Sequence, residues 1–229
     1  LLAVEKYDAA ARSAAAQALS PERREALVGC APASSTDPCV VAFLRSFLRR
    51  AFRRTIADDE VAPYLSVVEA AESGLGSVWQ GLSYAVATAL QSPFFLYRVE
   101  IGEQTAAGAR RFDDFEMASR LSFFLWDRAP DAALLDAAER GELMETDDLS
   151  RHASRLLADP RAEAPLRRFY DEWLGLERLD NLIKDAEVFP AFTPSLGVAM
   201  RGEMTRLIDE IIDGRGAMSL FDTTETWVN

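Results

Sequence analysis

Histidine and cysteine, the side chains that most often hold transition metals, are scarce in this chain of 229 residues. His152 is the single histidine, and neither Cys30 nor Cys39 belongs to the CxxCH pattern that attaches c-type haem. There is no HExxH sequence and no pair of ExxH sequences, so the usual helical zinc and di-iron centres lack their ligands. We therefore expect no metal site and no cofactor in this segment.

The phosphate-binding patterns GxxxxGK and GxGxxG are also absent, which removes the common nucleotide-binding loops. The stretch GLSYA at 81–85 misses the GxSxG pattern of a nucleophile elbow, and it falls inside a helical repeat. Carboxylate pairs are frequent, but several stand at predicted helix starts, where capping and the helix dipole account for them. The sequence thus predicts no catalytic residue and favours a segment that is not an enzyme by itself.

The formal net charge of −12 disfavours nucleic acid as a partner, because phosphate contacts need a basic surface. It suits a basic protein partner instead. No stretch has the length and apolarity of a transmembrane helix. The first twenty residues contain acids and no continuous apolar centre, so they predict an amphipathic helix and not a signal peptide. We expect the chain to be a segment of a longer protein.

Helix signals follow one another along the chain with few competing strand signals. Asp37, Asp159 and Thr193 each stand as a capping residue before a proline, which is typical of a helix start. The segment FFLYRVE at 94–100 fits either a helical turn or a short strand. We predict an all-α protein, an irregular multi-helix bundle of roughly ten helices without a significant sheet.

Residues 112–135 form the most apolar helical segment. Asp113 as N-cap and Glu116 three residues later predict a capping box at its start. Helical spacing predicts that its inward stripe contains Met117, Leu121, Phe124 and Leu125. Most of the other aromatic side chains of the chain are likewise expected in the core, since a sugar-stacking platform needs several of them exposed together.

Cys30 and Cys39 flank a short loop rich in proline and serine, which favours a disulfide over two unconnected thiols. The small, polar stretch EQTAAGAR at 103–110 resembles a linker. We therefore predict that residues 1–36 end a preceding helical domain and contain the cysteine-closed loop. Residues 37–105 and 106–229 are predicted to form two helical subdomains, separate or packed as one unit.

Arginines gather at the end of the helix predicted after Asp37. They form a local positive patch that could hold an anion or a partner's carboxylates, unless they cover a solvated helix end paired to the chain's own acids. The patch consists of Arg45, Arg49, Arg50, Arg53 and Arg54.

Two further arginines stand in apolar surroundings and are candidates for buried ion pairs. Arg120 is expected to pair with Glu116, one turn back, or with an acid of another helix such as Asp171. Arg98 and Glu100, which follow an aromatic run, invite the same interpretation.

Several long phrases resemble one known family. They are FLRRAFRRTIADDEV, ALQSPFFLYRVE, ASRLSFFLWDRAPDAALLDAA, LLADPRA, FYDEWLGLERL and the closing TWVN. The chain from about Asp37 onward is similar to consecutive domains of unknown function in large exported planctomycete and myxobacterial proteins. Residues 37–100 resemble one such domain and residues 110–229 the next.

Those proteins often carry, or are encoded near, planctomycete-type cytochrome c domains, and some carry carbohydrate-binding modules. The resemblance implies export to the periplasm or cell surface, which agrees with the proposed disulfide, and it supplies no catalytic residues. We expect a helical structural or interaction module that contacts neighbouring domains of the same chain or a c-type cytochrome, with any haem on a neighbouring domain. The alternative is a part of a polysaccharide-acting enzyme with a carboxylate-lined cleft between the two halves.

Overall fold

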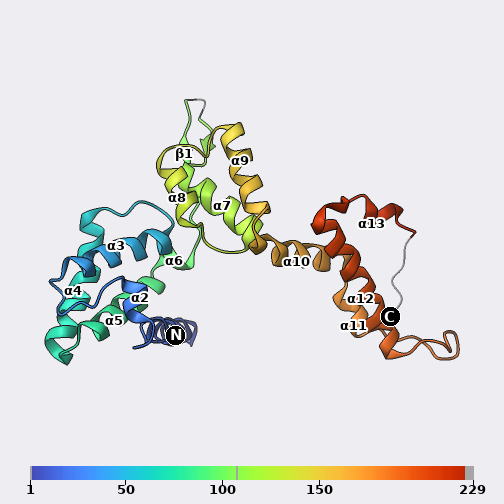
Figure 1. Ribbon diagram of the computed structural model, residues 1–229, viewed down its shortest axis with the longest axis horizontal. Helices are drawn as coiled ribbons and strands as arrows, with labels where there is room; N and C mark the ends of the chain where they lie inside the picture. Colours follow the sequence, from blue (N-terminus) through green and yellow to red (C-terminus); the bar gives the residue numbers. More distant parts are fainter. Residues whose placement is uncertain (1, 107, 225–229) are drawn as a thin grey trace. The chain divides into compact units, whose positions relative to one another are not determined.

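The computed structural model describes residues 2–106 and 108–224, and helices dominate this part of the chain (Figure 1). Thirteen α-helices and one two-stranded hairpin occur among the described residues, so the predicted all-α class is confirmed. The number exceeds the expected ten because α6 (Pro93–Leu96), α11 (Glu177–Asp180) and α13 (Ser219–Asp222) are single turns, too short for a periodic pattern. The closing TWVN lies outside the described residues.

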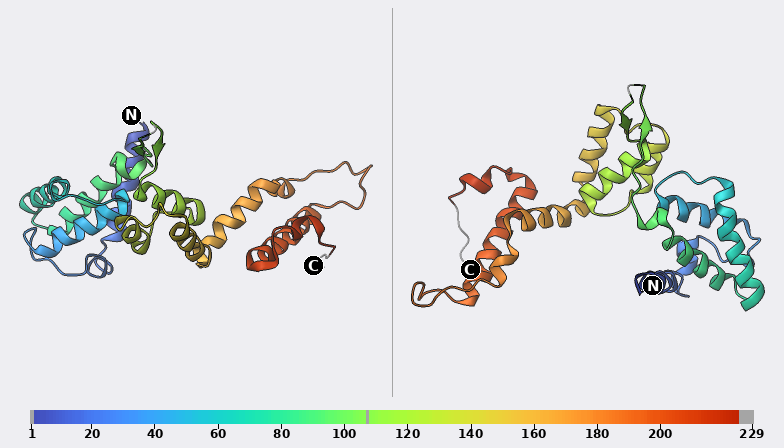
Figure 2. Two further views of the ribbon diagram at one scale, coloured as in Figure 1. Left: turned by 90° about the horizontal axis from the view of Figure 1, so that it is seen from above. Right: turned by 180° about the vertical axis from the view of Figure 1, so that it is seen from behind.

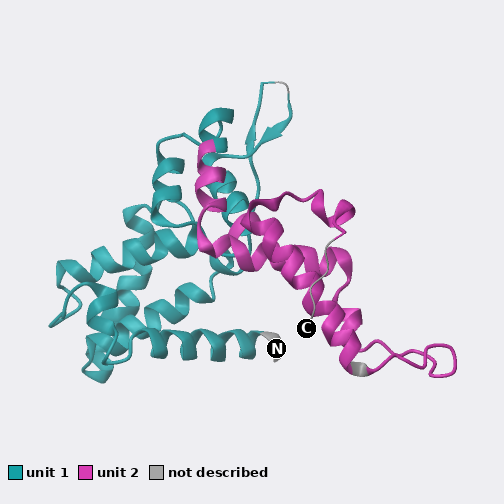
Figure 3. Ribbon diagram, turned by 45° about the vertical axis from the view of Figure 1, so that its right-hand side comes forward, with its two compact units in different colours: residues 1–123, 128–150 teal, residues 124–127, 151–229 magenta. Residues whose placement is uncertain are grey.

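The chain divides into two compact units, which are described separately (Figure 3). Unit 1 contains residues 1–123 and 128–150, and unit 2 contains residues 124–127 and 151–229. Neither α7 (Asp114–Trp126) nor α9 (Thr146–Leu157) belongs to one unit alone. The predicted division at 36/37 and 105/106 stays a prediction.

The first helices of unit 1 enclose an aliphatic core with Val40, Leu48 and Leu82 fully buried. Besides α6, they are α1 (Leu2–Ala18), α2 (Arg24–Val28), α3 (Pro38–Phe52), α4 (Asp58–Leu75) and α5 (Val78–Leu90). Helices α4 and α5 lie side by side in both views of Figure 2. They approach closely at Gly81, where a Cβ atom would stand 2.7 Å from the carbonyl oxygen of Val68. An alanine at this position would therefore push the two helices apart.

A hairpin replaces the linker expected at 103–110. Strands β1 (Glu103–Gln104) and β2 (Arg110–Arg111) pair antiparallel, with Glu103 opposite Arg111. Unit 1 continues through the first turns of α7, α8 (Ala132–Glu139) and the start of α9. The stretch is therefore an ordered part of unit 1 within its described residues, where composition alone indicated a linker.

The capping box predicted for α7 is present. The backbone N–H of Glu116 donates to the Asp113 carboxylate at 2.7 Å, and the Glu116 carboxylate accepts from the N–H of Asp113 at 3.0 Å. The expected inward stripe is wrong at Phe124, which is 81% exposed. The buried face contains Leu125, as predicted, together with Ala118, Ser122 and Trp126. These positions also follow helical spacing, so a helix this apolar can bury either of two faces. Here the indole of Trp126 lies inside and the Phe124 ring lies outside.

Unit 2 contains a smaller core of Tyr170, Leu176, Leu207, Ile208 and Ile211. Besides α11 and α13, its helical elements are the 3₁₀ turn η1 (Pro160–Ala162), α10 (Glu163–Leu174), α12 (Pro194–Glu210) and the π-helical turn η2 (Ile211–Arg215). Arg201 on α12 pairs with Asp171 on α10 and with Asp180 on α11, which connects three helices. The segment between α11 and α12 extends away from them as a loop (Figure 2).

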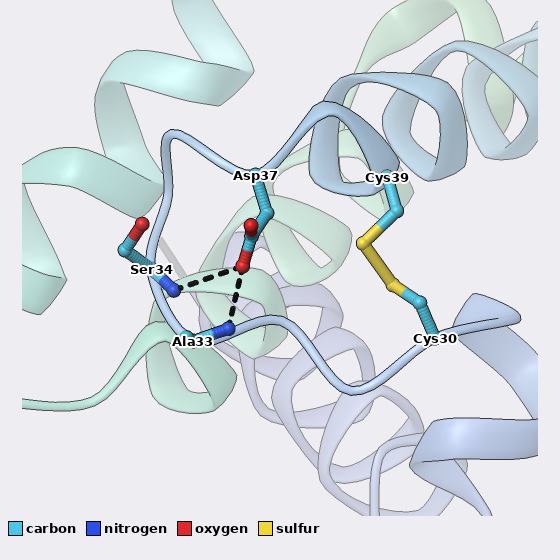
Figure 4. Close-up of a disulfide and its surroundings, with 5 residues drawn as sticks. All are labelled: Cys30, Ala33, Ser34, Asp37 and Cys39. Carbon is cyan, nitrogen blue, oxygen red and sulfur yellow. Dashed lines mark hydrogen bonds between the residues drawn. A yellow bond between two sulfur atoms is a disulfide. The ribbon is translucent and has the colours of Figure 1, made fainter.

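A disulfide joins Cys30 to Cys39, the first turn of α3 (Figure 4). The carboxylate of Asp37 accepts from the N–H groups of Ala33 at 2.6 Å and Ser34 at 3.2 Å. Asp37 therefore closes the preceding loop with its side chain, although it occupies the N-cap position of α3. Within the described residues, no helix has the combination of length and apolarity that a membrane span requires.

Breaking the disulfide should destabilise unit 1. The bond closes a loop with a sequence separation of 9. In the chain-entropy model a loop of this size contributes about 2–3 kcal/mol, because it restricts the unfolded chain. The C30S/C39S double variant should therefore lose about 2–3 kcal/mol in urea unfolding followed by circular dichroism. A reductant should lower the unfolding midpoint of the native protein and leave that of the variant unchanged; equal midpoints without reductant would contradict this role.

Candidate functional site

A cavity of about 310 Å³ in unit 1 is the candidate binding site. Its size lies at the lower end of the range of small-molecule pockets. Three stretches line it: the end of α3, the segment from Phe94 to Glu103, and the first turns of α7. The side chains that form its apolar wall are Phe52, Phe94, Tyr97, Val99, Ile101 and Phe115. Its polar atoms come mainly from arginine and carboxylate side chains.

Arg53 joins two walls of this cavity. It ends α3 in the left-handed conformation with φ 59°, which few residues other than glycine adopt. Its guanidinium donates to the carbonyl oxygens of Phe94 at 2.7 Å and Tyr97 at 2.9 Å, at the end of α6, and to that of Ala51 at 2.9 Å. Burial lowers the pKa of Arg53, and the charge of Arg98 lowers it further. Arg53 is 7% exposed, and its positive charge has no carboxylate partner in the described part of the chain.

Arg54, unlike Arg53, forms an ion pair. Its guanidinium binds the Glu60 carboxylate, and it stacks over the Phe94 ring at 4.7 Å from the centroid. Glu60 also accepts from the N–H of Ala57 at 3.1 Å, at the start of α4. The hydrogen bond from Arg54 lowers the pKa of Glu60 to about 2. The ion pair between Arg54 and Glu60 therefore connects the end of α3 to the start of α4.

Arg98 lies on the segment after α6 and stacks over the Phe123 ring at 5.0 Å from the centroid. Arg53 lies over the same ring at 6.0 Å. Two guanidinium groups therefore share one aromatic neighbour. Among the described residues, Arg98 does not form the predicted ion pair with a carboxylate. Its guanidinium contacts the ring of Phe123 instead.

Glu100 and Arg120 form an ion pair with 2.8 Å between Nη1 and the carboxylate. Arg120 is about half exposed, so the pair lies at the cavity rim and not in the interior. Glu116, which the sequence offered as its partner, accepts from the N–H groups of Ile101 at 2.6 Å and Gly102 at 2.8 Å in addition to its capping bond. These backbone hydrogen bonds outweigh burial and lower the pKa of Glu116. The carboxylate therefore fixes the base of the hairpin against α7.

The other arginines of the predicted patch separate from one another. Arg45 pairs with Asp58, and Arg49 pairs with Asp136 and Glu139 on α8. Arg50 is exposed and forms no hydrogen bond or ion pair within residues 2–106 and 108–224. Four of the five guanidinium groups thus bind partners within the protein, and two of these arginines, Arg53 and Arg54, line the cavity. The sequence analysis did not predict the cavity. The position of Arg98 among alternating apolar residues could have indicated a charged group on an apolar wall.

Three of the acids that line the cavity are engaged in local contacts. A glycosidase needs one carboxyl whose pKa is raised so that it can act as an acid, but the pKa of Glu116 in the cavity is lowered. Asp113 serves as a helix cap, and Glu100 is paired with Arg120. Among the residues that the structure describes, no group of three metal-ligating side chains is close enough to hold an ion. His152 is buried on α9.

Exposed aromatic rings gather in unit 2. Phe169 and Trp173, one turn apart on α10, have ring centroids 5.9 Å apart, and Trp173 lies edge-on to Phe221 of α13 at 6.2 Å. All three side chains are more than half exposed. Tyr170, which is buried, contacts Phe169 and Trp173 and connects them to the core of unit 2. We name Phe169, Trp173 and Phe221 the aromatic patch; the sequence predicted most aromatic side chains in the core.

Replacing Arg53 by alanine should destabilise unit 1 by about 2–4 kcal/mol, because one buried and several partly buried carbonyl groups lose a charged donor. Arg50→Ala is the matched control on the same helix and should change the stability by less than about 0.5 kcal/mol. Urea unfolding of both variants measures the difference. Equal effects of the two substitutions would show that the guanidinium of Arg53 adds no stability.

Acid should weaken the contact between Arg54 and Glu60. The pKa of Glu60 is about 2 in the folded protein against an ordinary value of 4.5, so the unfolded chain binds the proton more tightly. The stabilisation is therefore complete above pH 4.5 and is lost as the pH falls toward about 2. The urea midpoint should fall over this window, and Glu60→Gln should make its decline shallower. Parallel pH profiles for both proteins would rule out this contribution.

Two family descriptions match the chain in succession. Residues 39–100 match PSD5, a protein of unknown function (DUF1595), and residues 112–229 match PSD4, a protein of unknown function (DUF1592). The expected pair of consecutive domains of unknown function is thus confirmed. The chain matches no curated protein and no solved structure. Because the second match covers more than half of the sequence, the chain belongs to the PSD4 family of proteins of unknown function (DUF1592).

Proposed function

We propose that this chain is a non-catalytic helical interaction module that docks a partner domain through the aromatic patch of unit 2. The observation that carries the proposal is the exposure of three mutually contacting rings. Soluble proteins rarely leave such clusters uncovered, and tryptophan and other aromatic side chains dominate the binding energy of protein interfaces.

The patch has the rigidity that a docking surface needs. Phe169 and Trp173 stand on one helix, and their contacts with Tyr170 connect them to the buried core. The rings therefore lose little conformational freedom when a partner covers them. Arg168, which precedes Phe169 on α10, forms a salt bridge with Asp127, and charged residues of this kind are usual at an interface rim.

The partner that we propose is a neighbouring domain of a longer exported protein, with a c-type cytochrome domain as the first candidate. The disulfide supports the exported setting, since such bonds persist in oxidising compartments. The net charge of −12 favours a partner with a basic surface and an association rate that falls with salt.

The test is binding of a basic c-type cytochrome domain to the purified chain, followed by calorimetry at low and moderate salt. Trp173→Ser should weaken binding by about ten-fold or more, as expected for an aromatic anchor. Ile183→Ser is the matched control, because this side chain is 89% exposed and lies outside the patch. It should leave the affinity unchanged.

Absence of binding at low salt, or equal losses in both variants, would contradict the proposal. Retention of the chain on polysaccharide, abolished by Trp173→Ser, would favour the alternative of a polysaccharide-acting assembly, since sugar rings also stack on aromatic side chains.

A further inference from the structure

Two of the three arginines that line the cavity of unit 1 have no carboxylate partner among the described residues. Of its arginines, Arg54 is neutralised by Glu60, and of its acids, Glu100 is neutralised by Arg120. Arg53 and Arg98 have no carboxylate partner within residues 2–106 and 108–224. Two guanidinium groups on the cavity wall are therefore not paired with a described carboxylate, in a chain with a net charge of −12.

These two charges are close enough to act on one group. Both guanidinium groups stack over the ring of Phe123, and the charge of Arg98 lowers the pKa of Arg53. A bound anion would relieve this repulsion. The guanidinium of Arg98 is free of hydrogen bonds to other described side chains, so its planar edge remains available for two parallel bonds to a carboxylate.

Four acids also line the cavity, and three of them are engaged: Glu100 pairs with Arg120, while Asp113 and Glu116 accept from backbone N–H groups. The fourth, Glu103, is exposed on β1. Glu116 is further occupied by three backbone N–H groups. The rings of Phe52, Phe94 and Phe115 line the cavity as well.

We infer that the cavity binds an amphipathic carboxylate, a small molecule with a flat apolar body and one anionic group. The carboxylate binds Arg98 within the field of Arg53, and the apolar body lies against the phenylalanine rings. The volume of about 310 Å³ suits a ligand of about the size of a bicyclic aromatic acid. This site lies in unit 1 and does not depend on the docking function proposed for unit 2.

The test uses three probes with the same apolar body: 2-naphthoate, 2-naphthylmethanol and 2-naphthylmethylammonium. Calorimetric titration of the whole chain should give the highest affinity for the naphthoate, a weaker one for the alcohol, and the weakest for the cation. Raising the salt concentration should weaken naphthoate binding and leave the alcohol unaffected.

Arg98→Gln should weaken naphthoate binding by about ten-fold or more while the alcohol binds as before, because a charge-assisted pair is lost. Arg98→Lys keeps the charge but loses the planar edge and should give an intermediate affinity. Arg50→Gln removes the same charge from an exposed position outside the cavity and is the matched control. Circular dichroism and the urea midpoint of each variant establish that it is folded.

Three results would overturn the inference. They are no binding of any probe at millimolar concentration, equal affinities for the three probes, and equal losses in Arg98→Gln and Arg50→Gln. Failure of the cytochrome titration affects only the function proposed for unit 2, so the two hypotheses are tested separately.

Discussion

The guanidinium of Arg53 is the contact on which the site in unit 1 depends. It extends from the residue after the end of α3 to the carbonyl oxygens at the end of α6, and the last C=O groups of both helices lack intrahelical donors there. A positive charge at two helix C-termini is favoured by both dipoles. This explains how an arginine that is 7% exposed can remain charged without a carboxylate. The segment after α6 takes its direction from this contact, and it forms one wall of the cavity.

The acidic side chains stabilise local structure, although their number suggested other roles at first. Glu116 binds three backbone N–H groups, Asp37 closes the disulfide loop, and Asp114 accepts from the N–H of Leu143. Each of these contacts fixes the carboxylate in place, and those of Glu116 lower its pKa. A general acid needs the opposite, a carboxyl that retains its proton near neutral pH. The hydrogen bonds that hold the base of the hairpin therefore argue against a general-acid role for Glu116.

The sequence predicted local features well because they depend on neighbours in the chain. The helical class, the capping box of Asp113 and Glu116, and the loop between Cys30 and Cys39 all follow from spacing over a few residues. It failed where distant contacts decide. Arg120 selected Glu100 and not Glu116, because backbone N–H groups of another segment already occupied Glu116. Sequence spacing contains no information about that competition.

Burial of aromatic side chains shows the same limit and bears directly on function. Apolar character predicted Trp126, Phe124, Phe169 and Trp173 alike as core residues, yet Trp126 is 1% exposed and Phe124 is 81% exposed. Trp126 is inside because its indole N–H donates to the Leu156 carbonyl at 2.9 Å and Arg161 stacks on its ring. Phe124 has no such polar contact to fix the helix face. Trp173 contacts the core of unit 2 through the buried ring of Tyr170, and it is itself 55% exposed. An aromatic ring that packs on the core with one face and is exposed with the other keeps apolar surface in contact with water, which is unfavourable. Covering the exposed face by a partner recovers this hydrophobic free energy.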